Sequence, residues 1–201
     1  MRDSYEDERL RVQKLNVGPF DNCVYIVECR AAGAGVIIDA AAEADAILAA
    51  AEGIDISRVV ETHGHHDHIG ALDPVTEALG IPWAMHPADI EIAGRRPDEE
   101  LSEGQEIEVG ELNLHVVSTP GHTPGSVTFV LEPVAFTGDT LFPGGPGATR
   151  WEYSSFGQIM DSIERRIMPF PDATLVFPGH GAETTIGSER PYVSRWRSRG
   201  W

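Results

Sequence analysis

The chain has 201 residues, of which 41% are hydrophobic and 23% are charged, values typical of one globular domain with a large core. Its 32 acidic and 15 basic side chains give a net charge of −17, which excludes a basic surface for binding nucleic-acid phosphates. No stretch reaches the roughly 18 apolar residues that a membrane span needs, and residues 1–9 lack the apolar core of a signal peptide. We therefore expect one cytoplasmic domain over residues 1–201, flexible at residues 1–9, that binds neither nucleic acid nor membrane.

The first half of the chain is expected to alternate strands with two helices. Alternating or β-branched runs predict strands, and apolar or Ala-rich runs that end near a glycine predict helices. In chain order, these are strands at 10–17, 23–29 and 36–39, a helix at 41–51, a strand at 58–61, a helix at 69–79 and a strand at 82–86. Cys23 and Cys29 share one strand and lie about 20 Å apart, too far for a disulfide, which agrees with a cytoplasmic protein.

The second half is expected to contain two hairpins, a helix and a last strand. The hairpins join 107–109 to 112–117 and 127–131 to 134–137. Apolar residues at helical spacing predict a helix over 156–167, and 174–177 is expected to be the last strand. Four arginines follow it, namely Arg190, Arg195, Arg197 and Arg199. We interpret this cluster as a solvated tail; the alternative is a set of forks for carboxylates of a substrate or a neighbouring subunit.

Histidine and aspartate side chains gather where the expected strands end. One run, Thr62-His63-Gly64-His65-His66-Asp67-His68, follows the strand at 58–61, and the other candidates are flanked by turn-forming residues. The full candidate set is His63, His65, Asp67, His68, His122, Asp139 and His180. Imidazole and carboxylate are ligands that suit zinc and ferrous iron, and five His with two Asp are enough for two ions.

The spacing within the first run indicates an extended loop. Residues two apart diverge by about 200° on a helix but point to the same side of an extended chain. His63 and His65 are therefore expected to face one ion, with Asp67 and His68 turned toward a neighbouring ion.

These motifs resemble a known family. The pattern HxHxDH, followed by a His, an Asp and a His, is similar to the metallo-β-lactamase superfamily of metallohydrolases. Gly138-Asp139-Thr140-Leu141-Phe142 and Pro178-Gly179-His180-Gly181 most resemble its glyoxalase II, or hydroxyacylglutathione hydrolase, branch, and residues 184–190 resemble its short, single-domain members. The resemblance extends over residues 22–190. It implies an α/β fold, the αββα sandwich, in which two mixed β-sheets pack face to face with helices on the outside.

The resemblance also implies a role for each candidate ligand. His63, His65 and His122 would hold the first metal; Asp67, His68 and His180 would hold the second; Asp139 would bridge the two. Asp67 and Asp139 are thus the expected catalytic carboxylates. The implied cofactor is a pair of divalent ions, with zinc expected and iron or manganese as alternatives. β-Lactamases usually carry other residues at the places of His68 and Asp139, which argues against antibiotic hydrolysis.

Other residues are expected to support the centre or bind the substrate. Asp39 ends a β-branched strand, where an acid is costly unless paired, so we expect it to orient the metal loop. His66 points away from its neighbours in the run and is expected beside the ligands, in the pocket wall. In the loop 143–153, Arg150, Trp151 and Tyr153 offer an anion fork and flat apolar walls for the substrate.

The function that the resemblance implies is thioester hydrolysis, in which a bridging hydroxide attacks the thioester carbonyl. Two divalent ions, two carboxylates and one hydroxide leave a charge of about +1, so we expect a small anionic thioester as the substrate. Only 21 residues follow His180, too few for the C-terminal helical domain with which longer glyoxalase II proteins grip glutathione. The state of assembly stays open, a homo-oligomer included.

Two other functions remain possible from the sequence. One is a mononuclear iron sulfur (persulfide) dioxygenase, in which two histidines and one carboxylate hold the iron. Asp67, His68 and His180 would then have no ligand role, and their presence as a complete set argues for two ions. The other is a non-catalytic relative that uses the fold as a binding module.

Overall fold

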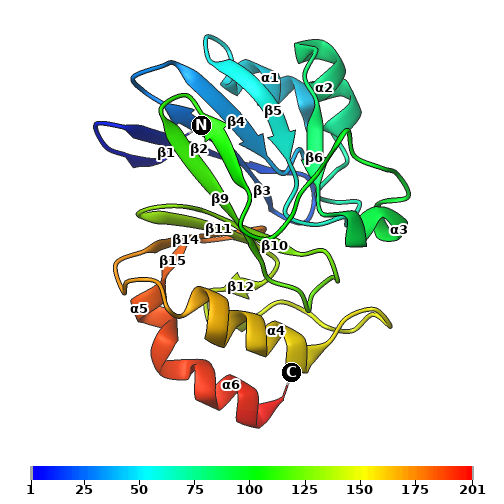
Figure 1. The fold of residues 1–201 in the computed structure, drawn as a ribbon, viewed down its shortest axis with the longest axis vertical. Coiled ribbons are helices and arrows are strands. Elements are labelled where there is room, and N and C mark those ends of the chain that lie inside the picture. Colours follow the sequence, from blue (N-terminus) through cyan, green and yellow to red (C-terminus); the bar gives the residue numbers. More distant parts are fainter. Residues whose placement is uncertain (1, 201) are drawn as a thin grey trace.

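The computed structural model describes residues 2–200 and contains two mixed β-sheets packed face to face. Helices cover the outer side of each sheet, α1 and α2 on one side and α4 and α6 on the other (Figure 1). The αββα sandwich expected from the resemblance is thus confirmed.

The first sheet has seven strands in the order of the chain. It is antiparallel from β1 to β4 and parallel from β4 to β7. Its strands are β1 (Arg2–Glu6), β2 (Leu10–Val17), β3 (Asn22–Cys29), β4 (Ala34–Ile38), β5 (Asp55–Val60), β6 (Trp83–Met85) and β7 (Glu99–Glu100). Residues 2–6, which the sequence analysis expected to be flexible, pair with β2 as a strand; their flexibility stays a prediction, and Met1 lies outside the described residues.

The second sheet has six strands in the order β15-β14-β11-β10-β9-β8. All of its neighbours are antiparallel except β11 and β14. Its strands are β8 (Glu106–Val109), β9 (Leu112–Ser118), β10 (Val127–Leu131), β11 (Val134–Gly138), β14 (Leu175–Pro178) and β15 (Thr184–Thr185). A separate hairpin joins β12 (Leu141–Phe142) to β13 (Gly145–Pro146). Both hairpins expected from the sequence are confirmed.

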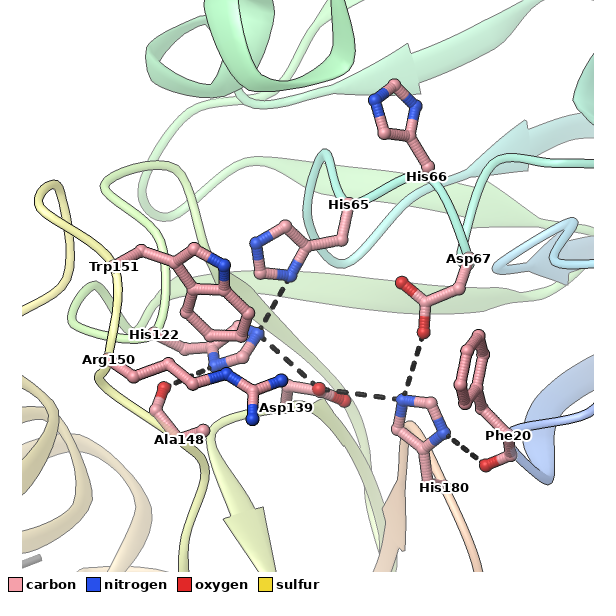
Figure 2. A pocket seen from close by; sticks show the side chains of 10 residues that line it. All are labelled: Phe20, His65, His66, Asp67, His122, Asp139, Ala148, Arg150, Trp151 and His180. Carbon is pink, nitrogen blue, oxygen red and sulfur yellow. Dashed lines mark hydrogen bonds and ion pairs between the residues drawn. The ribbon is translucent and has the colours of Figure 1, made fainter.

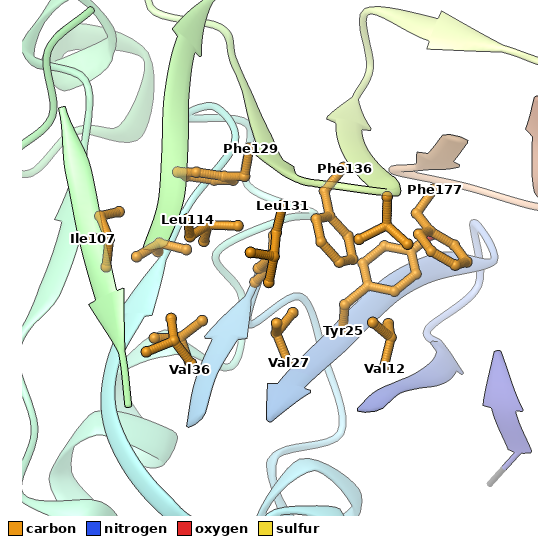
Figure 3. Packing of buried hydrophobic residues seen from close by; sticks show 14 of the residues in the cluster. Val12, Tyr25, Val27, Val36, Ile107, Leu114, Phe129, Leu131, Phe136 and Phe177 are labelled. Atoms are coloured by element: carbon orange, nitrogen blue, oxygen red, sulfur yellow. The ribbon is translucent and has the colours of Figure 1, made fainter. Parts of the chain in front are cut away.

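The alternation of β3 shows how the sequence builds two cores. Tyr25 and Val27 point into the core between the sheets, whereas Val24 and Ile26 point into the core beneath α1 and α2. Strand residues alternate between faces, so a strand that is apolar at every position is buried on both sides. Figure 3 shows the inter-sheet core, where side chains of the first sheet meet Phe136, Phe177 and others of the second.

Two helices of the first half begin three residues later than the sequence predicted, whereas α4 begins at Phe156 as predicted. α1 is Ala44–Ala50 because Glu43 has a left-handed backbone (φ 58°) that delays the first turn. α2 is Leu72–Leu79 because residues 66–68 form a turn of the ligand run, and it ends at Gly80 as expected. The remaining helices are η1 (Pro87–Asp89), α3 (Ile90–Ala93), α4 (Phe156–Ser162), the π-helical turn η2 (Ile163–Ile167), α5 (Ile186–Glu189), η3 (Arg190–Tyr192) and α6 (Val193–Arg199). No helix within residues 2–200 is both long enough and apolar enough to cross a bilayer.

The arginine-rich end is not the solvated tail that the sequence favoured. It forms α6, whose Val193 and Trp196 are buried against α4 and η2. Arg197 binds Asp161 and Glu164 of the opposite helical segment at 2.6 and 2.7 Å. Two of the four arginines that we weighed as forks, Arg190 and Arg197, do bind carboxylates, but those of the same chain.

Candidate metal centre

The seven candidate ligands come together at one edge of the sandwich. The loop after β5 carries His63, His65, Asp67 and His68, while the loop after β9 carries His122. Asp139 follows β11, and His180 follows β14, the parallel neighbour of β11. Residues 63–65 belong to neither a helix nor a strand, and a turn follows, in which the His68 N–H donates to the His65 carbonyl at 2.9 Å. This turn separates the first two ligands from Asp67 and His68.

The ligand atoms form two neighbouring groups. In the first, Nδ1 of His65 is 3.0 Å from Nε2 of His63 and 3.0 Å from Nε2 of His122. In the second, Nε2 of His68 and Nε2 of His180 are 3.2 Å apart. Oδ2 of Asp67 lies 3.5 Å from the His180 nitrogen and 3.9 Å from the His68 nitrogen. These groups contain the same residues as the two sets that the resemblance implies.

Asp139 lies between the two groups (Figure 2). Its Oδ1 is 3.5 Å from His68 Nε2, and its Oδ2 is 3.4 Å from His122 Nε2 and 3.6 Å from His180 Nε2. Oδ1 is buried without a hydrogen-bond partner, which is costly for a carboxylate oxygen unless a cation faces it. Gly179 is needed here because a Cβ at its position would lie 2.3 Å from that oxygen.

Each histidine uses its outer nitrogen for a contact with oxygen, which turns its inner nitrogen toward the centre. The outer pairs are His63 Nδ1 with Thr62 Oγ1 at 3.1 Å, His65 Nε2 with Tyr153 Oη at 2.8 Å, His68 Nδ1 with Asp39 Oδ2 at 2.9 Å, His122 Nδ1 with Ala148 O at 2.8 Å, and His180 Nδ1 with Phe20 O at 2.8 Å. Oxygen contacts of this kind fix the tautomer of metal-binding imidazoles. The donor set therefore fits two divalent ions.

Asp39 orients one histidine in each group. The buried carboxylate accepts hydrogen bonds from the Thr62 N–H at 2.7 Å and from the Thr62 hydroxyl at 2.8 Å, besides its contact with His68. Because the Thr62 hydroxyl donates to Asp39, its oxygen is left to accept the Nδ1 proton of His63. The place of Asp39 beside the metal loop is as expected from the sequence.

A second buried aspartate, Asp89, joins two ligand loops. Its side chain accepts from the N–H of Gly64 at 2.8 Å, from the N–H of Gly125 at 2.6 Å and from the Thr123 hydroxyl at 2.6 Å. Gly64 stands between His63 and His65, and Thr123 follows His122. Asp89 therefore ties together the loops that carry the whole first group.

Charge and burial set different proton affinities in the two groups. Burial, followed by the neighbouring imidazoles, lowers the pKa of His65 to about 4 and holds the pKa of His63 well below its usual range. Burial also opposes the charged form of His68, but the carboxylates of Asp139 and Asp39 outweigh it and raise its pKa to about 9. Burial opposes ionisation of Asp139 too, yet positive charge from His68 and a hydrogen bond with His180 hold its pKa well below the usual value.

A cavity of about 440 Å³ opens above the centre, and Arg150, Trp151, His66 and Phe20 line it with several of the candidate ligands. His66 is exposed, and its ring points away from the ligand nitrogens (Figure 2). The Arg150 guanidinium carbon lies 4.8 Å from the centre of the Trp151 ring. Tyr153 does not line the cavity, because it stacks on Trp151 and its hydroxyl contacts His65.

Three contacts of the centre were not anticipated from the sequence. Asn22 donates to Asp67 Oδ2 at 3.0 Å, Asp89 ties the two loops, and the Phe20 carbonyl contacts His180. Their partners lie 25 to 160 residues away in the chain, so local patterns do not reveal them.

A sandwich with a histidine and aspartate centre at its strand ends is the architecture of a metallohydrolase. The chain belongs to the metallo-beta-lactamase superfamily, whose family model matches residues 17–180.

Two of the relatives are named as hydroxyacylglutathione hydrolases. A hydroxyacylglutathione hydrolase of Rhodospirillum rubrum is 39% identical over 80% of this chain and 62% of its own length. Hydroxyacylglutathione hydrolase GloC of Haemophilus influenzae is 31% identical over 77% of this chain and 83% of its own. The chain thus spans less than two thirds of the Rhodospirillum protein.

Solved structures agree with the fold. TTHA1623 in a di-iron-bound form is 32% identical with a TM-score of 0.80 and covers 89% of this chain and 97% of its own. ETHE1 from Myxococcus xanthus is 29% identical with a TM-score of 0.82 and covers 92% and 83%. The B3 metallo-beta-lactamase BLEG-1 is 30% identical with a TM-score of 0.81 and covers 90% and 96%.

Proposed function

We propose that the protein is a binuclear metal-dependent hydrolase that cleaves a small anionic thioester, in the manner of a hydroxyacylglutathione hydrolase. The observation that carries this proposal is the position of Asp139, whose two oxygens face two separate groups of three ligands. A mononuclear centre needs only one such group. The names of the Rhodospirillum and Haemophilus relatives support the thioester as the substrate class.

The residues of the centre would have two kinds of role, namely binding the two ions and positioning the ligands. Two bound divalent ions would polarise the carbonyl oxygen and lower the pKa of shared water from 15.7 to about 7. His63, His65 and His122 would hold one ion, Asp67, His68 and His180 the other, and Asp139 both. Asn22 and the Phe20 carbonyl keep Asp67 and His180 in position for the second ion.

Arg150 supports an anionic substrate. Its guanidinium lines the cavity beside Trp151, and no carboxylate among residues 2–200 forms an ion pair with it. Planar guanidinium groups bind carboxylates through two parallel hydrogen bonds. We therefore assign Arg150 to a substrate carboxylate and Trp151 to the adjoining apolar wall.

Zinc is the proposed metal, with iron or manganese as alternatives, and the cytoplasm is the proposed compartment. The two cysteines are free and buried, which suits a reducing compartment.

Removal and return of metal tests the proposal. A strong chelator should abolish hydrolysis of a thioester such as S-lactoylglutathione, and zinc, manganese or iron should restore it. Full activity in metal-free protein would contradict the proposed mechanism. The same samples distinguish the hydrolase from a sulfur dioxygenase. The hydrolase should hold two ions per chain and cleave the thioester, whereas a dioxygenase would hold a single iron and consume oxygen when it is given a persulfide.

A further inference from the structure

A second cavity, of about 390 Å³, adjoins the metal centre. It shares Asp139, Ala148 and His180 with the 440 Å³ cavity described above, so both open onto the bridging carboxylate. We call the 390 Å³ cavity the loop cavity and the 440 Å³ cavity the arginine cavity. The other walls of the loop cavity are residues 142–147, which form the β12–β13 hairpin. The centre therefore lies where two cavities meet.

The two cavities differ in chemistry. Residues 142–147 have the sequence Phe-Pro-Gly-Gly-Pro-Gly and bring no charged side chain to the loop cavity. Two of the loop's N–H groups are already used, because Gly144 donates to Glu189 and Gly147 to the Thr140 carbonyl. The arginine cavity instead has the Arg150 guanidinium and the exposed Phe20 ring. An anionic group is therefore favoured in the arginine cavity, and an uncharged group in the loop cavity.

We propose that the two cavities hold the two arms of one thioester. This inference rests on the proposed function. The carboxylate-bearing thiol arm lies in the arginine cavity, and the uncharged acyl arm lies in the loop cavity, which places the carbonyl carbon at the centre between them. Water oxygen bonds to this carbon, the carbon–sulfur bond breaks, and the acid and the protonated thiol leave from separate cavities.

One aromatic side chain marks each arm. Phe142 lines only the loop cavity, and its ring is 6.3 Å from the His180 ring. Phe20 lines only the arginine cavity and is 66% exposed. The contact of Phe20 with His180 uses the backbone carbonyl, so a change of the Phe20 side chain leaves that contact in place. The two phenylalanines are therefore matched positions for testing each arm separately.

The test crosses two variants with two substrate series. One series keeps a carboxylate-bearing thiol and lengthens the acyl group from acetyl to hexanoyl. The other keeps the acetyl group and compares that thiol with a neutral one. Phe142→Ala should shift the acyl-length preference in kcat/KM by about tenfold and leave the thiol preference within about twofold. Phe20→Ala should shift the thiol preference by about tenfold and leave the acyl-length preference within about twofold.

Controls keep the test clear. Phe142→Leu and Phe20→Leu repeat the comparison with smaller changes, and metal content shows that each centre is intact. Tyr192→Ala, which removes an exposed aromatic on η3, should shift neither preference. The two-arm arrangement would be overturned if Phe142→Ala and Phe20→Ala shift the same preference, or if neither variant shifts any preference. In both cases the wild-type protein would still hydrolyse thioesters. A wild-type protein that hydrolyses no thioester would overturn the proposed function together with this inference.

Discussion

The carboxylate of Asp39 lies 2.9 Å from Nδ1 of His68, and both side chains are only 1% exposed. This contact turns Nε2 of His68 toward Asp139, Asp67 and His180. If one charge of such a buried pair is removed, the remaining charge has no partner to compensate it. The geometry of the second ligand group therefore depends on a residue that is not itself a candidate ligand.

Asp39→Asn should weaken the second ion more than the first. The asparagine amide would place N–H groups against a donor of Thr62 or His68, so His68 should lose its orientation. We expect the affinity for the second ion to fall about 10- to 100-fold, measured by titration of metal-free protein. Asp73→Asn is the control, because that acid is exposed and paired with Arg95. Equal weakening in both variants would contradict the role of Asp39.

Asp89→Asn should affect the first ligand group. The carboxylate accepts three hydrogen bonds, and an amide nitrogen in its place would leave a buried donor of Gly64 or Gly125 unsatisfied. We expect the free energy of unfolding of the metal-free protein to fall by about 1–3 kcal/mol in denaturant titrations. The affinity for the ion held by His63, His65 and His122 should fall as well. Loss of the second ion alone would show that Asp89 acts elsewhere.

Arg150→Ala should act on anionic substrates. A charge-assisted hydrogen bond contributes about 1.5–3 kcal/mol, so kcat/KM for an anionic thioester should fall about ten- to hundredfold. The loss for a neutral thioester should be much smaller, because no carboxylate meets the guanidinium. If both substrates lose equally, Arg150 has a structural role beside Trp151.

The stability of the metal-free protein should decline on both sides of about pH 6.5, the pKa of histidine in an unfolded chain. The pKa of His68 is raised to about 9, so its contribution is complete below about pH 6.5 and is lost as the pH rises through about 9. The pKa of His65 is lowered to about 4, so its contribution is present above about pH 6.5 and is lost as the pH falls through about 4.

Denaturant unfolding of chelator-treated protein between about pH 4 and about pH 10 measures both limbs. His68→Asn should flatten the alkaline limb, whereas a change at the exposed His115 of β9, His115→Asn, should leave both limbs in place. An alkaline limb that persists without His68 would show that another group causes it.

Local patterns predicted most of the fold because each strand and helix repeats its own period. The strands at 10–17, 127–131 and 134–137 matched closely, because most of their β-branched and apolar residues are buried in the sheets. Helix starts were less accurate because Glu43 adopts a left-handed backbone that no periodicity shows. The arginine-rich end was misread for a related reason, since α6 is stabilised by Asp161 and Glu164 more than thirty residues away.

The sequence predicted the candidate ligands of the site, but it predicted few of the residues that hydrogen-bond those ligands and their loops. The HxHxDH run and its turn-flanked partners carry their signal in the local sequence. Asp89 and Asn22 carry none, because each acts only when loops far apart in the chain meet. Tyr153 was expected to bind substrate, which stays a prediction, and its contact with the outer nitrogen of His65 was not foreseen.

Metal titration of chelator-treated protein, followed by metal analysis, tests the central claim that Asp139 joins two ion sites. The wild-type protein should bind two ions per chain, Asp67→Ala should retain one, and His66→Ala should retain both. Asp139→Ala should lose affinity for both ions, because its two oxygens face both groups. A wild-type protein that binds one ion, or equal loss of metal in Asp139→Ala and His66→Ala, would contradict the binuclear centre.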